Sequence, residues 1–101
     1  VLSCAMLAVR IDGCHVTTLE GLQDEAKEFA LYMGREGADR CGFCNPGFVM
    51  NVVAMVRKLD APTEDDIKEF LSGNLCRCTG YVSHMRAIKA YFKAKGKEVR
   101  A

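Results

Sequence analysis

The chain has 101 residues, of which 50% are hydrophobic, and its formal net charge is +1 with both signs mixed along the sequence. This length allows one domain, or a small domain joined to a piece of another. A charge so close to zero gives no reason to expect a nucleic-acid or membrane-surface protein, and the apolar runs are too short and too often interrupted by charge to span a bilayer.

The first residues are apolar and predict β structure. Residues 1–9 lead to a turn at Ile11-Asp12-Gly13, and residues 15–18, "HVTT", are typical of a short second strand. Because two strands alone are marginal in water, we expect this segment to be the end of a sheet whose other strands are absent. The segment also lacks the features of a signal peptide and begins in mid-pattern without Met, so we expect the true N-terminus to lie upstream.

Four helical segments are predicted after these strands. The first spans about 22–35, and the second opens at Asn45, an N-cap residue followed by a proline suited to the first helical position. The third begins after Thr63, an N-cap followed by acidic residues that suit the positive helix start, and it ends at Gly73. The fourth begins after Gly80.

Each of these segments has apolar residues at helical spacing. The positions expected to face inward are Leu22, Ala26, Phe29, Ala30 and Met33 in the first helix, Phe48, Val49, Val52, Val53, Val56 and Leu59 in the second, Ile67, Phe70 and Leu71 in the third, and Tyr81, Met85, Ile88 and Phe92 in the fourth. Short amphipathic helices with short connections predict a compact four-helix bundle.

Cysteines are the most informative residues of the chain. Its six cysteines are Cys4, Cys14, Cys41, Cys44, Cys76 and Cys78. The last four form a Cys-x2-Cys pair and a Cys-x-Cys pair, each in a glycine-bearing loop at a helix boundary. Two such loops can converge at one end of a bundle, where backbone N–H groups can donate to anionic sulfur. Clustered cysteines in a helical chain favour metal binding over disulfides and a reducing, cytoplasmic location.

Several kinds of cysteine site are compatible with the two pairs. Inert buried thiols and disulfides are the weaker interpretations, and structural zinc is the main competitor of an iron–sulfur cluster. Zinc sites usually combine two Cys-x2-Cys pairs over a shorter spacer than residues 45–75, so spacing favours iron–sulfur only slightly. A Rieske centre is excluded, because neither His15 nor His84 stands two or three positions after a cysteine. We expect His84 to be an exposed polar residue.

The sequence around the cysteines is more specific than their spacing. "CGFCNPGFVMNVVAMVRKL" and "PTEDDIKEFLSGNLCRCTGY" closely resemble the C-terminal [2Fe-2S]-binding domain of the molybdenum hydroxylase family. That family includes xanthine dehydrogenase, aldehyde oxidoreductase and the small subunit of aerobic carbon monoxide dehydrogenase. Its domain carries Cys-Gly-Phe-Cys-Thr-Pro-Gly and Gly-Asn-Leu-Cys-Arg-Cys-Thr-Gly-Tyr with the same spacer. "SCAMLAVRIDG" and "VTTLEGL" resemble the last strands of the plant-type ferredoxin domain that precedes it, so the resemblance covers essentially the whole chain.

The resemblance implies a mainly α fold with two parts. Residues 21–101 would be the helical [2Fe-2S]-binding domain, and residues 1–20 a β remnant of a truncated ferredoxin-like domain. The implied ligands of one [2Fe-2S] cluster, which lies nearest the molybdenum cofactor in the family, are Cys41, Cys44, Cys76 and Cys78.

The resemblance also implies individual roles for two cysteines, one within this ligand set and one outside it. Cys78 matches the ligand that approaches the pterin, which makes it the candidate for electron entry. Cys4 matches one ligand of a second cluster, whose other ligands belong to a Cys-x4-Cys-x2-Cys run that this sequence lacks. Cys14 has no ligand counterpart.

The chain departs from the family pattern at two positions. Arg40 stands where the family often has a glutamine that hydrogen-bonds the pterin, so we expect Arg40 near the pterin without assuming the same contact. Asn45 replaces the usual threonine, and since both are good N-caps we expect that change to be neutral.

The function implied is electron transfer. The chain would be a non-catalytic iron–sulfur component of a molybdenum-dependent hydroxylase or dehydrogenase, passing electrons from the molybdopterin centre through its cluster toward a second cluster and FAD. A large molybdopterin-binding catalytic subunit and an FAD-binding subunit would be its partners, with no nucleic acid and no membrane. The alternative is a zinc-stabilised structural or interaction module that has lost redox function.

Overall fold

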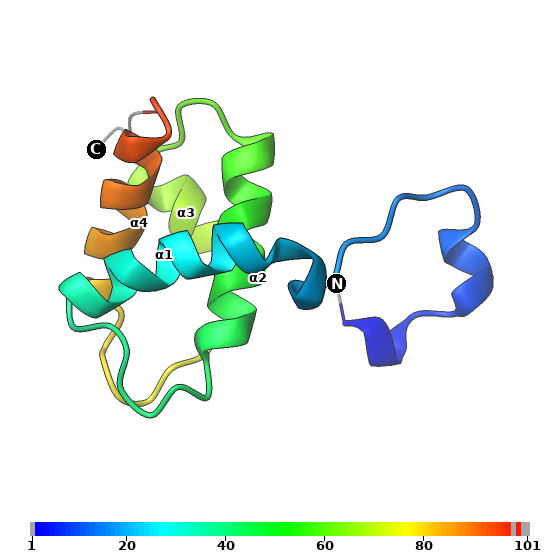
Figure 1. The fold of residues 1–101 in the computed structure, drawn as a ribbon, viewed down its shortest axis with the longest axis horizontal. Helices are drawn as coiled ribbons and strands as arrows, with labels where there is room; N and C mark the ends of the chain where they lie inside the picture. The colour runs from blue at the N-terminus through cyan, green and yellow to red at the C-terminus, as the bar shows by residue number, and fades with distance from the viewer. Residues whose placement is uncertain (1, 98, 100–101) are drawn as a thin grey trace.

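A computed structural model describes residues 2–97 and 99, so Val1 of the first predicted strand lies outside the described residues. The described chain is mainly helical, as predicted (Figure 1). Its α-helices are α1 (Gln23–Arg35), α2 (Asn45–Lys58), α3 (Glu64–Phe70) and α4 (Val82–Ala94), and its short 3-10 turns are η1 (Ser3–Ala5), η2 (Ala8–Ile11) and η3 (Leu19–Leu22). None of the described helices is both long and apolar enough to cross a membrane.

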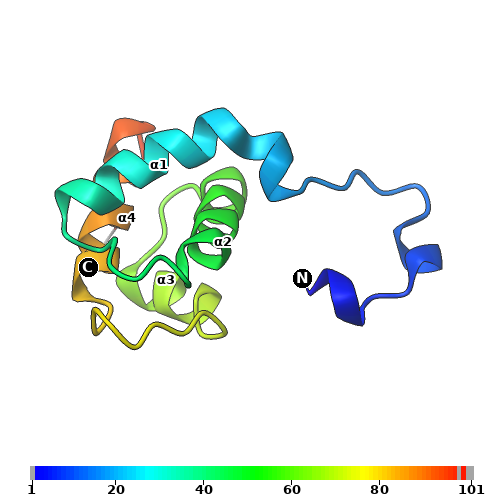
Figure 2. The same cartoon turned by 60° about the horizontal axis from the view of Figure 1, so that its bottom comes forward.

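The core lies where the apolar faces of the four α-helices meet. Helix α1 lies across α2 and α4, and α3 packs beside α2 (Figures 1 and 2). On α4, Tyr91 meets Phe29 of α1 edge-to-face with ring centroids 5.3 Å apart, an arrangement that aromatic rings favour. The largest fully buried apolar side chains are Tyr91, Phe29, Phe48, Phe92, Met33, Met55, Ile67, Ile88, Val52 and Val53. The helical periodicity of the sequence therefore located most of the core.

The N-terminal arm, residues 2–18, runs away from the bundle (Figure 2). The strands predicted at 1–9 and 15–18 are absent, since no strand occurs among the described residues. A strand needs a neighbour for its N–H and C=O groups, and the described part of the chain supplies none. Local turns provide partners for some of the arm's backbone N–H and C=O groups instead. For example, the Arg10 N–H donates to the Leu7 carbonyl at 3.0 Å.

The N-cap predicted for α3 is confirmed by the structure, whereas the one predicted for α2 is not. At α3 the capping box is complete, because the Asp66 N–H donates to Thr63 Oγ1 at 3.2 Å and the Thr63 N–H donates to Asp66 Oδ2 at 3.0 Å. The prediction that Asn45 caps α2 is wrong. Asn45 is the first helical residue, and its amide donates to Asp39 at 2.9 Å instead.

The start of α4 contains the one described non-glycine residue with a positive φ. Tyr81, the N-cap, has φ 74°, directly after Gly80 at φ 69°. Two left-handed residues in succession turn the chain sharply from the second cysteine loop into α4, and the tyrosine is strained there by about 1–2 kcal/mol. Contrary to prediction, Tyr81 is 42% exposed. Its hydroxyl accepts the Cys76 N–H at 2.8 Å, which ties the helix start to the loop.

Candidate metal centre

Two loops bring the cysteine pairs to the same end of the bundle. One joins α1 to α2 and carries Cys41 and Cys44, and the other joins α3 to α4 and carries Cys76 and Cys78 (Figures 1 and 2). All four residues line one cavity of about 450 Å³. The structure therefore places the four cysteines together, although residues 45–75 separate the pairs in the sequence.

An asparagine in the second loop holds that loop against α2. Asn51 of α2 donates its side-chain N–H to the side-chain oxygen Oδ1 of Asn74. The Asn74 amide also lies so close to Gly47 that a Cβ at position 47 would be only 2.8 Å from its nitrogen. Glycine at position 47 thus allows the second loop to approach the first turn of α2.

The thiols face one another across the two loops. Cys44 and Cys76 have sulfur atoms within 4.8 Å of each other, and interaction with Cys41 is the main cause that raises the pKa of Cys78. Each of these interactions joins a thiol of the first loop to a thiol of the second.

The two thiols of the Cys44–Cys76 pair differ in acidity. A hydrogen bond with Thr79, at 3.3 Å, lowers the pKa of Cys76 to about 7. Desolvation first, and then interaction with Cys76, raises the pKa of Cys44 to about 11. For Cys78, the hydrogen bond with Cys41 raises the pKa. Because the thiolate is the metal-binding form, Cys76 is the thiol of this pair that loses its proton, and so becomes ready to bind a metal, at the lower pH.

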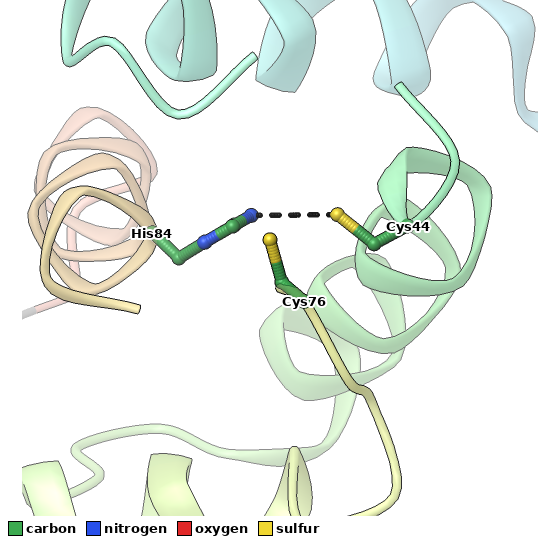
Figure 3. Close-up of side chains that lie close together, drawn as sticks. All are labelled: Cys44, Cys76 and His84. Carbon is green, nitrogen blue, oxygen red and sulfur yellow. Dashed lines mark hydrogen bonds between the residues drawn. The ribbon is translucent and has the colours of Figure 1, made fainter. Parts of the chain in front are cut away.

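His84 lies beside these thiols, and the prediction that it is exposed is wrong. Its side chain is 1% exposed, and its ring stacks on Phe48 with centroids 4.1 Å apart. The Nε2 atom is 3.9 Å from Cys44 Sγ (Figure 3). On the other side of the ring, Nδ1 is 3.0 Å from Thr79 Oγ1. Burial lowers the pKa of His84 and favours the neutral ring. Its helical spacing to the buried Ile88 was a signal in the sequence that would have placed it inward.

The remaining candidate residues lie outside the cavity. Arg40 is exposed and adjoins Cys41 in the loop. Cys4 is exposed within η1 of the arm, and the structure does not bring it to the other cysteines. Cys14 is also exposed in the arm, where its sulfur lies 4.0 Å from the Arg10 carbonyl.

Comparison with known proteins identifies the kind of site these loops form. A family model described as a [2Fe-2S] binding domain matches residues 18–89, which include both cysteine loops. The chain belongs to the [2Fe-2S] binding domain family.

Several relatives of this [2Fe-2S] binding domain are subunits of oxidoreductases by name. The chain is 42% identical over 86 residues to a probable xanthine dehydrogenase subunit of Bacillus subtilis (strain 168), covering 84% of this chain and 50% of that protein. It is 38% identical over 91 residues to the nicotinate dehydrogenase small FeS subunit of Eubacterium barkeri, covering 88% and 58%. The resemblance inferred from the sequence is confirmed at this level.

A solved structure agrees with the computed one. The crystal structure of quinoline 2-oxidoreductase from Pseudomonas putida 86 matches 94% of this chain and 62% of its own, with a TM-score of 0.72 and 36% identity. The chain therefore spans between half and two thirds of the length of these relatives.

The residues present fit a [2Fe-2S] cluster. Such clusters are held by cysteine thiolates, and N–H donors around the sulfur atoms stabilise their negative charge. Here four thiols from two loops line one cavity that is open to solvent. Cys44 is the N-cap of α2, so the positive end of that helix lies at the site.

Proposed function

We propose that this chain is the electron-transfer iron–sulfur component of a molybdenum-dependent hydroxylase or dehydrogenase. In this proposal Cys41, Cys44, Cys76 and Cys78 hold one [2Fe-2S] cluster. The observation that carries it is the convergence of these four thiols on one cavity at the end of a helical frame. When bound, the cluster supplies one-electron transfer, and the chain itself performs no bond chemistry.

The protein's own contribution is to hold the sulfur atoms in place. The facing arrangement suggests that Cys44 and Cys76 bind one iron and that Cys41 and Cys78 bind the other. Thr79 and Tyr81 fix the position of Cys76, one through its sulfur and one through its backbone N–H. Ligands held in this way would change position little between the oxidised and reduced states. The reorganisation energy would then be small, which suits electron transfer.

The mouth of the cavity suits contact with another subunit. Phe43 is 93% exposed and Leu75 is 77% exposed, and both line the cysteine cavity. Large apolar side chains exposed around a functional site are typical of interaction surfaces. We propose that the large molybdopterin-binding catalytic subunit covers this end. Cys78, which is exposed, would then receive electrons, and Arg40 would lie near the pterin.

The N-terminal arm would belong to the next step of the electron path. We propose that residues 1–20 end a ferredoxin-like domain and that residues 21–101 are the helical domain. Cys4 would supply one ligand of a second cluster, with the other ligands outside this sequence, and FAD on a further subunit would accept the electrons. The expected setting is the cytoplasm, with no nucleic-acid or membrane partner.

Iron and sulfide analysis under anaerobic conditions tests this proposal. We expect two irons and two sulfides per chain, with visible charge-transfer bands that bleach on reduction. Cys76→Ser should abolish the cluster, whereas Cys14→Ser, in the exposed arm, should retain it. A colourless protein with zinc and no sulfide would instead support a zinc-stabilised interaction module. Full iron content in Cys76→Ser would contradict the ligand assignment.

A further inference from the structure

A second, smaller set of metal-ligand atoms lies at the edge of the cysteine cavity. Cys44 Sγ, Cys76 Sγ and a ring nitrogen of His84 all lie within 4.8 Å of one another (Figure 3). This set uses only two of the four cluster cysteines and adds a buried histidine to which the electron-transfer role gives no task.

The spacing of these atoms is close to that of a tetrahedral zinc site. Zinc bonds sulfur at about 2.3 Å and imidazole nitrogen at about 2.0–2.1 Å, so tetrahedral ligand atoms lie roughly 3.5–3.8 Å apart. The distance from Cys44 Sγ to His84 Nε2 is 3.9 Å. Closing the site around one ion therefore requires only small side-chain movements.

The hydrogen bonds around Thr79 direct the free lone pair of His84 toward the thiols. Thr79 Oγ1 accepts the Tyr81 N–H at 3.2 Å and has one hydrogen to share between Cys76 and His84. A metal-bound Cys76 is a thiolate and can only accept, so the Thr79 hydrogen turns to it. His84 Nδ1 then carries the ring proton and donates to Thr79, which leaves Nε2 free to bind metal.

This arrangement is common to histidines that bind metals in proteins. The ring nitrogen that does not bind the metal donates to an oxygen, which fixes the tautomer and the orientation of the ring. Here Thr79 supplies that oxygen at 3.0 Å from Nδ1, and Phe48 stacks on the ring. The ring of His84 is thus held in place by Thr79 and Phe48, and metal binding at Cys76 then selects the tautomer with a free Nε2.

Charge and coordination number also suit a divalent ion of intermediate softness. Two thiolates and one neutral imidazole balance the charge of Zn²⁺, and both are ligands that zinc prefers. Cys44 and Cys76 line the solvent-open cavity, so water from it can supply the fourth ligand. Binding requires the loss of the Cys44 proton to solvent.

We propose that Cys44, Cys76 and His84 form a mononuclear Zn²⁺ site in the chain when it carries no cluster. The site goes beyond the electron-transfer role and does not require it. Because zinc and a cluster would both need Cys44 and Cys76, occupancy by zinc excludes the cluster. Zinc bound here would compete with cluster assembly.

Cobalt titration of the metal-free full chain, kept anaerobic and reduced, tests the proposal. Co²⁺ takes tetrahedral zinc sites and reports them by visible absorption. We expect one Co²⁺ per chain, displaced by one equivalent of Zn²⁺. His84→Leu should weaken binding by more than about a hundredfold, above the 10- to 100-fold typical for loss of a residue behind a ligand. Thr79→Val should weaken it within that range.

The thiol variants separate this site from the cluster site. Cys44→Ser should lose cobalt binding, whereas Cys41→Ser and Cys78→Ser should retain it and yet fail to assemble a [2Fe-2S] cluster with iron and sulfide. Equal losses in all of these variants would mean a four-thiolate zinc site and would overturn the proposal. So would tight cobalt binding by a folded His84→Leu chain.

A readout on the unmutated chain guards against misfolding of a variant. The sulfur-to-cobalt charge-transfer intensity grows with the number of bound thiolates, and we expect the value for two rather than four. A chain that binds cobalt in this way but never assembles a cluster would refute the electron-transfer proposal and leave the zinc site standing. A chain that assembles a cluster but binds cobalt with the charge-transfer intensity of four thiolates would refute the zinc site and leave the electron-transfer proposal standing.

Discussion

The bundle and the N-terminal arm differ in what becomes of their apolar residues. In the bundle, Phe29 and Ile88 are 0% exposed, whereas in the arm Leu7 is 69% and Val9 is 79% exposed. The arm is not short of apolar side chains. It lacks a complementary face in this chain, whereas each helix of the bundle meets another. Apolar sequence therefore becomes a core only where a second surface is available to exclude water.

The cysteines differ in the same way between the two regions. Cys4 and Cys14 stand exposed in the arm, while Cys44 and Cys76 are partly buried and face each other at the end of the bundle. Burial at the end of the bundle raises the pKa of Cys44, and a hydrogen bond with the nearby Thr79 lowers the pKa of Cys76. The same residue type is thus an ordinary surface thiol in one region and part of a candidate metal centre in the other.

The largest expected difference between the bundle cysteines and an exposed cysteine of the arm is in their reactivity toward an alkylating reagent. In the metal-free chain, Cys76 has its pKa lowered to about 7 and Cys44 has its pKa raised to about 11. Since the thiolate reacts, iodoacetamide at pH 7 should modify Cys76 roughly 50- to 100-fold faster than Cys44, after allowing for the lower nucleophilicity of the more acidic thiol.

Peptide mass spectrometry across pH 6–10 measures both rates in the same sample. The rate at Cys76 should level off above its pKa, while that at Cys44 should still be rising at pH 10. Cys4 serves as the control, because an exposed thiol should react equally before and after denaturation. Parallel profiles for Cys44 and Cys76 would show that burial of Cys44 and the Thr79 hydrogen bond to Cys76 do not separate the two pKa values in solution.

Truncating a core aromatic should separate the two regions by stability. Phe29→Ala removes a fully buried ring that contacts Tyr91, and we expect a loss of about 3–5 kcal/mol in the free energy of unfolding. Val9→Ala in the exposed arm should change it by less than about 0.5 kcal/mol. Urea denaturation followed by circular dichroism measures both. Similar losses would mean that the arm packs on a surface in solution.

Removing the cap of α3 should have an intermediate effect. Thr63→Ala deletes one half of the capping box with Asp66, which should lower the free energy of unfolding by about 1 kcal/mol. Thr18→Ala is the matched control, since Thr18 precedes η3 without a capping hydrogen bond from its side chain. The same urea titration applies, and an equal loss at both positions would argue against the box.

Deleting residues 1–14 should have the smallest effect. These residues contribute no buried side chain to the core among those described, so the unfolding midpoint in urea should move little. Leu19 packs against the core and is kept in the shortened chain. A large drop in the midpoint would contradict the difference between the two regions, because it would show that the arm stabilises the bundle.

Much of the fold was predictable from the sequence for local reasons. Helical spacing placed Phe29, Ile67 and Ile88 inward, and all three are fully buried. Thr63 and Asp66 form the predicted cap because their partners are three residues apart. The cysteine loops and the residues around them also pointed to the family that the comparison confirmed. Signals of this kind need only a few neighbouring residues.

The tertiary structure decided what depends on contacts between distant segments. The pairing of Cys44 with Cys76, and the place of His84 beside them, join residues that lie 32 and 40 positions apart along the numbering. The absence of the predicted strands has the same origin, since a strand forms only beside another strand. Sequence patterns predicted the four α-helices and the candidate cysteine ligands. Only the packed chain determines which of those ligands meet, because that depends on how separate elements share one solvent-excluding surface.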